Sequence, residues 1–313
     1  MFLSIWEDFK RSFAHGNMVT RLIIANIIVF VAINLLKIIL FAGAGGQTPL
    51  LYDDILHFFC LSSSVWKSLL HPWTLVTSMF LHEGFWHIVW NMLFLYWFGQ
   101  IVGDFIGNHR VLPLYLLGGL VGALAFWLGA LALPYSMGGG NNFALGASAA
   151  VMSFVVAAAT ISPDYLMRIL LFGDVKLKYV ALVLFFLDLM GIANVNNTGG
   201  HFAHLGGAFF GWFFVTQLRN GRDFSAPINS AFAAISSFFQ NIFSQKSASQ
   251  KRPKPKMAYK NEDKKYQKTT SNQSNSSESF QSELDSILDK IKQTGYDSLT
   301  AEDKAFLFQA SKK

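Results

Sequence analysis

The stretch of residues 200–211 reads GHFAHLGGAFFG, and it decides how the rest of the chain is interpreted. Helical spacing within this apolar segment places Gly200, His204, Gly207 and Gly211 on one face. Small residues on one face let two membrane helices approach closely, so we expect this face to bring the imidazole of His204 into a tight helix contact. A neutral imidazole suits a general base in an apolar site. The competing interpretation is a structural histidine bonded to a neighbouring serine or carbonyl.

The composition is that of a membrane protein. Hydrophobic residues make up 52% of the 313 positions and charged residues only 14%, whereas a soluble domain carries about 25% charged residues. The net charge of +6 would fit nucleic acid, but the basic residues gather near segment ends and in the C-terminal tail, which favours membrane orientation. We therefore expect a lipid bilayer and no nucleic acid as the surroundings. Cys60 is the only cysteine, so an internal disulfide is excluded, and no cleavable signal peptide is evident.

Six apolar stretches are candidates to cross a bilayer core of ~30 Å, which takes about 20 helical residues. The fourth and fifth are short, which suits helices buried among others. The sequence therefore predicts an all-α polytopic membrane protein, a bundle of six transmembrane helices with a flexible cytoplasmic tail. The stretches run over residues 20–41, 81–102, 111–133, 146–161, 179–193 and 200–218.

The short segments between these stretches differ in charge. Arg110 lies between the second and third stretches, and Arg168, Lys176 and Lys178 lie between the fourth and fifth. On the opposite side of the membrane, Lys67 is the only lysine or arginine in these segments. Because basic residues are retained in the cytoplasm, both termini are predicted to be cytoplasmic.

The chain is expected to divide into four regions. The third combines an amphipathic helix along the cytoplasmic interface with a basic, polar linker. The regions are a cytoplasmic N-terminal segment at 1–19, the membrane domain at 20–219, the helix and linker at 220–280, and a small helical hairpin at 281–313.

The fourth stretch begins LGASAA at residues 145–150. Ser148 is expected in the first turn of a helix, after Gly146, with small neighbours and the positive end of the helix dipole beneath it. Both features help a hydroxyl act as a nucleophile and help backbone N–H groups hold an oxyanion. Close helix packing is the competing interpretation.

The second stretch contributes His82, His87 and Asn91. The last two are four residues apart and share a face, where their donors suit an oxyanion hole in which one donor contributes ~3 kcal/mol. The sequence HEGFWH at 82–87 has one residue too many for the zinc-binding His-Glu-x-x-His helix. Histidines five apart on one helix diverge by about 140°. We therefore expect no metal and no cofactor.

The predicted orientation brings the candidate residues to one side of the membrane. It places the beginnings of the second, fourth and sixth stretches on the same outer side of the membrane. Ser148, His204, His87 and Asn91 can therefore meet at one depth. Loops rich in glycine and asparagine at 134–143 and 194–200 are expected to be mobile on that side.

These motifs resemble those of the rhomboid proteases, over nearly all of residues 20–219. The resemblance lies in His82 with His87-x-x-x-Asn91, in GASA at 146–149, and in AHLGGAFFG at 203–211. It implies a six-helix bundle with a water-filled cavity opening outward. It also implies a Ser–His dyad that cuts single-pass transmembrane proteins near their helix ends.

The resemblance assigns a role to each residue. Ser148 would be the nucleophile and His204 the base. His87, Asn91 and the backbone N–H of Ser148 would line the oxyanion hole, within a motif that begins at Gly146. His82 would hold loop structure or water.

Two departures concern the surroundings of the base. Ala149 stands where many members have glycine, and Met152 stands where many have a tyrosine that stacks on the base, so His204 needs another support. Asp188 could complete a triad, but the dyad of the family favours a hydrogen-bonded structural acid. His201 is expected at the mouth of the cavity.

The tail from Ser282 resembles the helical hairpins appended to some bacterial rhomboids, which suggests a bacterial inner membrane. The sequence thus predicts an intramembrane serine endopeptidase acting on single-pass transmembrane proteins. The alternative is a catalytically inactive rhomboid-like protein that binds transmembrane partners, against which the intact Ser148 and His204 count. A transporter would show inverted repeats, and no clear repeat is found.

Overall fold

The chain is mostly helical and forms two compact units, Met1–Ala248 and Ser249–Lys313. Most of the predicted N-terminal segment and linker, and the greater part of the glycine-rich loop before the fourth stretch, lie outside the described residues. The computed structural model describes residues 10, 13, 16–133, 142–169, 173–193, 197–244 and 275–310.

Six helices of the first unit coincide with the six predicted stretches. Two helical segments of the described residues, Met18–Gly43 and Asn108–Ala132, are long and apolar enough by themselves to cross a membrane. The count of six crossings therefore stays a prediction. The helices are α2 (Met18–Gly43), α6 (Phe85–Ile106), α7 (Val111–Ala132), α8 (Ser148–Ile161), α9 (Leu177–Gly191) and α10 (Thr198–Arg219).

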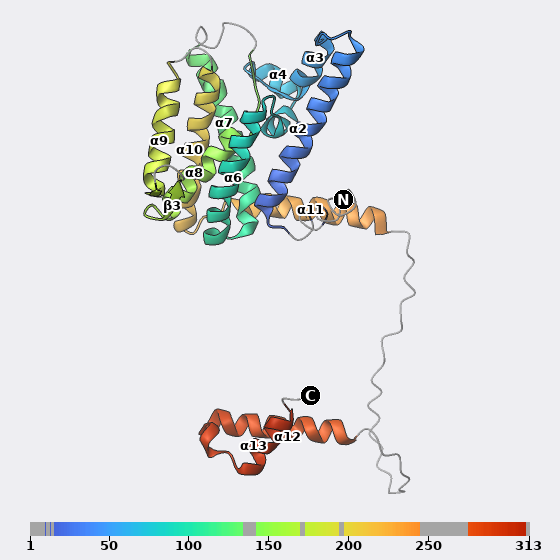
Figure 1. The fold of residues 1–313 in the computed structure, drawn as a ribbon, viewed down its shortest axis with the longest axis vertical. Coiled ribbons are helices and arrows are strands. Elements are labelled where there is room, and N and C mark those ends of the chain that lie inside the picture. Colours follow the sequence, from blue (N-terminus) through green and yellow to red (C-terminus); the bar gives the residue numbers. More distant parts are fainter. Residues whose placement is uncertain are drawn as a thin grey trace. The chain divides into compact units, whose positions relative to one another are not determined.

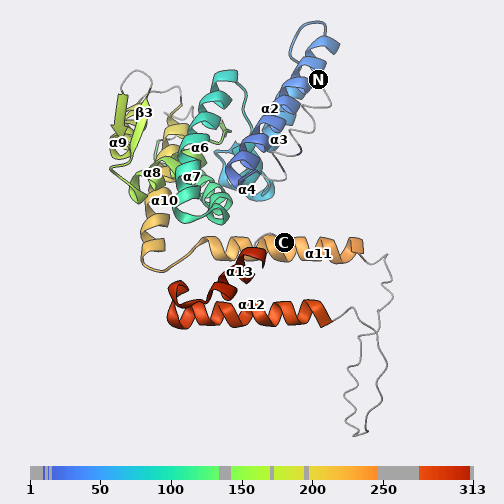
Figure 2. The ribbon, with the colours of Figure 1, turned by 60° about the horizontal axis from the view of Figure 1, so that its bottom comes forward.

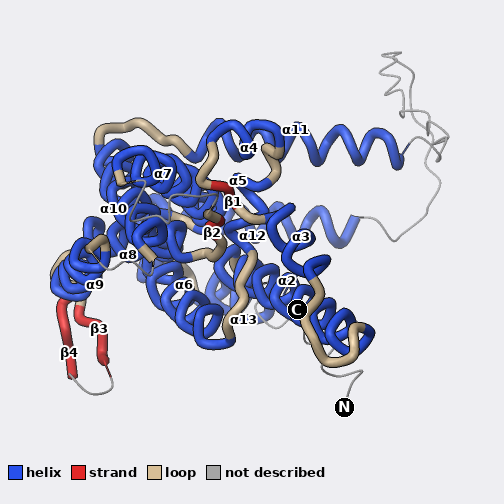
Figure 3. Tube along the Cα trace, turned by 90° about the horizontal axis from the view of Figure 1, so that it is seen from above, coloured by secondary structure: helices blue, strands red, loops and turns tan. Residues whose placement is uncertain are grey.

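The short helix α8 lies at the centre of this bundle. It contacts α6, α7, α9 and α10, and the view from above shows it between them (Figure 3). Helix α8 approaches α10 closely because the glycines of α10 have no side chain at the contact. A Cβ at Gly207 would overlap the carbonyl oxygen of Ala149, and one at Gly211 would overlap that of Ser153. The glycine face predicted around residue 204 is therefore the face that packs on α8.

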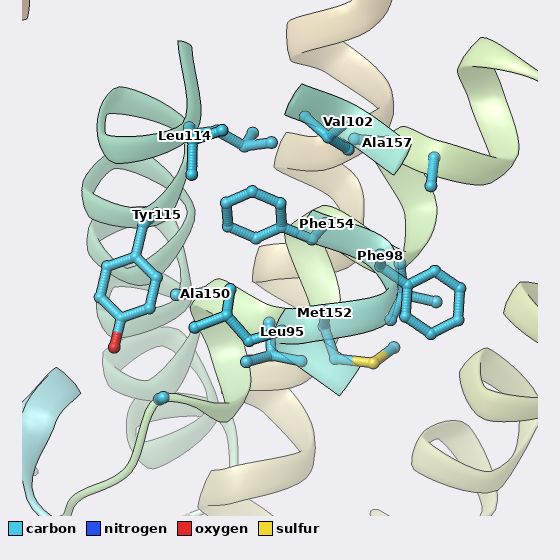
Figure 4. Packing of buried hydrophobic residues seen from close by; sticks show 14 of the residues in the cluster. Leu95, Phe98, Val102, Leu114, Tyr115, Ala150, Met152, Phe154 and Ala157 are labelled. Atoms are coloured by element: carbon cyan, nitrogen blue, oxygen red, sulfur yellow. The ribbon is translucent and has the colours of Figure 1, made fainter. Parts of the chain in front are cut away.

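Large apolar side chains from α6, α7 and α8 fill the centre of the bundle (Figure 4). Leu95, Phe98, Leu114 and Phe154 are fully buried and interdigitate as closely packed interiors require. The hydroxyl of Tyr115, also fully buried, donates to the carbonyl oxygen of Met79 at 2.8 Å. This bond ties α7 to the segment that precedes α6.

The segment between α2 and α6 has more structure than the sequence predicted. Strand β1 (Leu61–Ser62) pairs antiparallel with β2 (Phe143–Ala144), which ties this segment to the residues preceding α8. Its helices are α3 (Leu50–Phe59), α4 (Val65–Leu70), α5 (Thr74–Thr77) and the 3-10 helix η1 (Ser78–Phe80).

The predicted beginning of the second helix was wrong by four residues. Helix α6 begins at Phe85, because Gly84 takes an extended conformation and forms the N-cap. His82 therefore lies in the preceding loop and not on the helix. His82 and His87 are therefore not directed apart by a shared helix, and the centroids of their rings lie 5.0 Å apart.

The side of the bundle opposite the start of α8 carries a hairpin and a long helix. Strands β3 (Leu166–Ile169) and β4 (Gly173–Lys176) pair antiparallel between α8 and α9. Helix α11 (Ser225–Ser244) crosses the foot of the bundle (Figure 1). A salt bridge of 2.7 Å between Arg110 and Asp223 holds the start of α11 near the 3-10 helix η2 (Asn108–Arg110).

The second unit is a helical hairpin (Figure 2). Helix α12 (Asn275–Thr294), the 3-10 helix η3 (Tyr296–Ser298) and α13 (Ala301–Ala310) follow one another. Thr300 caps α13, since its hydroxyl accepts from the backbone N–H of Asp303 at 3.2 Å.

Candidate active site

The start of α8 and the upper part of α10 bring a serine and a histidine into hydrogen-bond contact. Ser148 is the first residue of α8, and His204 lies in the second turn of α10. The Oγ of Ser148 and the Nε2 of His204 are 2.6 Å apart. Both side chains are partly buried. The two residues that the sequence singled out as nucleophile and base are therefore in direct contact.

The turn before Ser148 depends on a glycine. Gly146 has φ of +122°, a conformation that favours glycine, and its N–H donates to the carbonyl oxygen of Ser78 at 2.8 Å. A Cβ at this position would lie 2.8 Å from the Nε2 of His87. Gly146 therefore shapes the turn and leaves room for the His87 ring beside the serine.

His87 and Asn91 face the serine from α6. Both line the same cavity as Ser148 and His204. The amide of Asn91 donates to the backbone carbonyl of His87 at 2.9 Å, and an amide has a second N–H donor. The first N–H groups of α8 also lack acceptors within the helix, as at any helix start. The cavity beside Ser148 is thus lined by two side chains of α6 that can donate hydrogen bonds.

His82 supports the turn instead of lining the cavity. It is 1% exposed, and its Nε2 accepts a hydrogen bond of 3.3 Å from the backbone N–H of Ala147. This contact is of the loop-holding kind that the resemblance implied. It fixes the residue next to Ser148.

A cavity of about 840 Å³ is lined by Ser148, His204, His87 and Asn91. Its remaining walls are largely apolar, with side chains from α6 on one side, from α9 on another, and from α8 below Ser148. A cavity with apolar walls and a few convergent polar groups is the usual form of a binding site. The apolar lining includes Trp86, Trp90, Phe94, Val151, Met152, Val155, Leu184 and Leu187.

Asp188 on α9 contacts His204. From the sequence, membership of a triad was the less favoured role of this acid, and a structural role was preferred. Its Oδ1 lies 2.7 Å from the Nδ1 of His204 and 2.8 Å from the Nδ1 of His201. His201 was predicted at the mouth of the cavity, but it is not among the described residues that line it. Its ring packs beside Gly191. An acidic residue inside an apolar helix was the signal available in the sequence.

Asp188, His201 and His204 are residue types that can bind a metal ion. Their ligand atoms lie within 4.8 Å of one another. Two imidazole N–H groups that donate to one carboxylate oxygen account for both short distances without an ion.

Comparison with known families identifies two regions of the chain. Residues 70–220 match the family described as Rhomboid domain, and residues 270–313 match a family of unknown function, DUF6576. The first match covers α6 to α10 and the loop before α6, which together contribute all the residues of the site. The second covers the predicted C-terminal hairpin but assigns it no role.

Individual relatives carry rhomboid names. RHOMBOID-like protein 12, mitochondrial, of Arabidopsis thaliana is 28% identical over 69% of this chain and 63% of its own length. The human presenilin-associated rhomboid-like protein, mitochondrial, is 27% identical over 63% of this chain and 47% of its own length. Rhomboid protease GluP of Bacillus subtilis is 24% identical over 47% of this chain and 26% of its own length.

This chain thus spans less than two thirds of the length of each of these relatives. The similarity supports a membrane protein with a rhomboid domain. The mitochondrial names do not support the bacterial inner membrane that the tail had suggested.

Proposed function

We propose that this chain, whose residues 70–220 match the Rhomboid domain family, is an intramembrane serine endopeptidase that cuts transmembrane proteins. The observation that carries the proposal is the 2.6 Å contact between Ser148 Oγ and His204 Nε2 inside a partly apolar cavity. A nucleophile within hydrogen-bond reach of its base is the arrangement that acyl transfer requires.

The proposed reaction begins when His204 Nε2 accepts the proton of Ser148 and Oγ attacks the carbonyl carbon of the scissile peptide bond. The tetrahedral intermediate collapses as the protonated His204 gives its proton to the leaving amine. An ester between Ser148 and the N-terminal part of the substrate remains. Water then attacks this ester with His204 again as base, and Oγ regains its proton as the acid product leaves.

Charge on the tetrahedral oxygen would be stabilised by donors already in place. The backbone N–H of Ser148 lies at the start of α8, and the side chains of His87 and Asn91 reach the cavity from α6. One such donor contributes ~3 kcal/mol to the transition state. Preorganisation is supported by Gly146 and His82, which hold the turn before Ser148.

Substrate would enter the cavity from the bilayer, between α6 and α9. The apolar lining on this side includes Trp90 and Phe94 of α6 and Leu184 and Leu187 of α9, which suit a transmembrane segment. A crosslink that fixes α9 to α6, in a Cys60→Ala background, is expected to abolish turnover until it is reduced. Full activity of the crosslinked protein would contradict lateral access.

We also propose that α11 lies along the membrane surface and that both termini are on the side of the basic segments, which the positive-inside rule makes cytoplasmic. Phe232, Ile235 and Phe239 are each about half exposed on α11, at 45%, 52% and 53%. The helix runs across the foot of the bundle and not along it (Figure 1). An amphipathic helix in this direction buries its apolar face in the interface.

The test is cleavage of a single-pass transmembrane substrate by the purified chain in liposomes, beside Ser148→Ala and His204→Ala. Ser153→Ala is the matched control on α8, since that hydroxyl bonds only backbone carbonyls of Ala150 and Leu114 among the contacts the structure gives it. Loss of cleavage in the two site variants, with activity in the control, is expected. Cleavage that survives Ser148→Ala would refute the assignment.

Absence of cleavage by the folded chain on several substrates would favour the second function, a rhomboid-like protein that binds transmembrane partners without cutting them. A fluorophosphonate separates the two functions independently of substrate choice. Labelling of Ser148 that requires His204 supports the protease.

A further inference from the structure

One oxygen of a buried carboxylate lies between two imidazoles at the edge of the active site. Asp188 is 8% exposed, and its Oδ1 is 2.7 Å from His204 Nδ1 and 2.8 Å from His201 Nδ1. The acid is on α9 and both histidines are on α10, so the contact joins two helices. Two N–H donors reduce the cost of burying the carboxylate.

The contact determines where His204 holds its proton. A carboxylate oxygen only accepts, so Nδ1 at 2.7 Å carries the hydrogen, and in a neutral ring Nε2 then has a lone pair. That lone pair faces Ser148 Oγ at 2.6 Å. This is the tautomer that can accept the serine proton. When it does so, the positive charge formed on the ring lies beside the carboxylate.

His201 and Gly191 hold the acid in place. The Nδ1 of His201 donates to the same oxygen, and a Cβ at Gly191 would lie 2.7 Å from Cδ2 of the His201 ring. Gly191 is one turn after Asp188 on α9, so its missing side chain makes room for the ring that supports the carboxylate. The hydrogen bond from His201 therefore helps to hold the Asp188 carboxylate in position.

A metal ion at these three side chains would give the opposite chemistry. Bound to Nδ1 of His204, it would leave the single remaining ring proton on Nε2, which could then donate to Ser148 but not accept its proton. Only the arrangement with protons on both Nδ1 atoms leaves His204 a base. The 2.6 Å distance to Ser148 Oγ is a hydrogen bond in either arrangement, and with the proton on Nδ1 the Nε2 atom is its acceptor.

We propose that Asp188 is a positioning residue that makes the site a Ser148–His204–Asp188 triad, with His201 holding the acid. This inference rests on the proposed protease function. It gives His204 the support that Met152 cannot provide by ring stacking. It also makes α9, which forms one wall of the cavity, responsible for the orientation of the base.

The kinetic test compares Asp188→Asn with Asp104→Asn, a control that makes the same change at an exposed position of α6. Asparagine can present its N–H₂ to Nδ1 and so stabilise the wrong tautomer, a change that lowers kcat by up to ~10⁴ in serine protease triads. We expect kcat to fall at least about a hundredfold, with KM within about twofold of that of wild type. A kcat equal to that of Asp104→Asn would overturn the proposal.

A second measurement does not depend on cleavage. In ¹⁵N-histidine spectra of the wild-type protein, with His204 assigned by its loss in His204→Gln, Nδ1 is expected to carry the proton. A His204 protonated on Nε2 would overturn the proposal even in a protein that cuts nothing. If wild-type cleavage fails while the Nδ1 tautomer is observed, the protease function fails and the positioning role of Asp188 stands.

Discussion

A single methyl group at Gly207 is expected to separate Ser148 from His204. A Cβ there would overlap the carbonyl oxygen of Ala149 and lie 2.8 Å from its carbonyl carbon. Carbon atoms rest about 3.5–4.0 Å apart, so α10 must withdraw from α8 by about 1 Å. Ser148 Oγ and His204 Nε2, now 2.6 Å apart, would then be separated by about 3.6 Å, which is no longer a hydrogen bond.

A misplacement of about 1 Å costs on the order of 10²-fold in rate. Cleavage of the single-pass substrate and fluorophosphonate labelling of Ser148 by Gly207→Ala should therefore both fall by about that factor. The control is Gly103→Ala on α6, where the added Cβ would be 3.6 Å from Val111 and fits without movement. Thermal unfolding in detergent shows whether each variant is folded. A folded Gly207→Ala that cleaves as fast as Gly103→Ala would refute the reasoning.

Two further predictions concern parts outside the bundle. Burial, followed by the charge of Glu83, raises the pKa of Cys60 to about 12, so iodoacetamide at pH 8 should leave the native thiol unmodified; rapid alkylation, measured by mass spectrometry, would contradict this. Burial opposes ionisation of Asp223, but hydrogen bonds from Ser225 and Arg110 outweigh it and hold the pKa of Asp223 below its usual value. This attachment of α11 is therefore complete above about pH 4 and is lost as the pH falls through the lowered pKa. Asp223→Asn should speed hydrogen exchange in the first turns of α11 at pH 7, and unchanged exchange would contradict it.

The sequence predicted the long helices well because apolar length is a strong signal. All six predicted stretches are helical, with ends that differ by a few residues. The elements between α2 and α6 carry no such signal, since α4 and α5 have only six and four residues. Their positions depend on contacts distant in sequence, such as the pairing of Leu61 with Ala144. The position of His82 was missed because the predicted stretch began at Leu81, whereas α6 begins only after its N-cap Gly84.

The candidate site was predictable in its members but not in its connections. Ser148, His204, His87 and Asn91 stood out as polar residues at helical spacing, and all four line one cavity. Asp188 was recognised as costly in an apolar helix. Its contact with His204 depends on the rotation of α9 against α10, which the packing of both helices sets and no local pattern encodes.

Packing and chemistry therefore depend on the same residues. Apolar surface gives little drive for helices to associate within lipid, so close approach must come from small residues in contact. Gly207 and Gly211 provide it by meeting the backbone of α8 at Ala149 and Ser153. His204 is one turn from Gly207, and Ser148 is next to Ala149, so the contact that holds the two helices together also fixes the distance between the His204 imidazole and the Ser148 hydroxyl. A substitution that loosens this seam should be detected as lost catalysis before it is detected as lost fold.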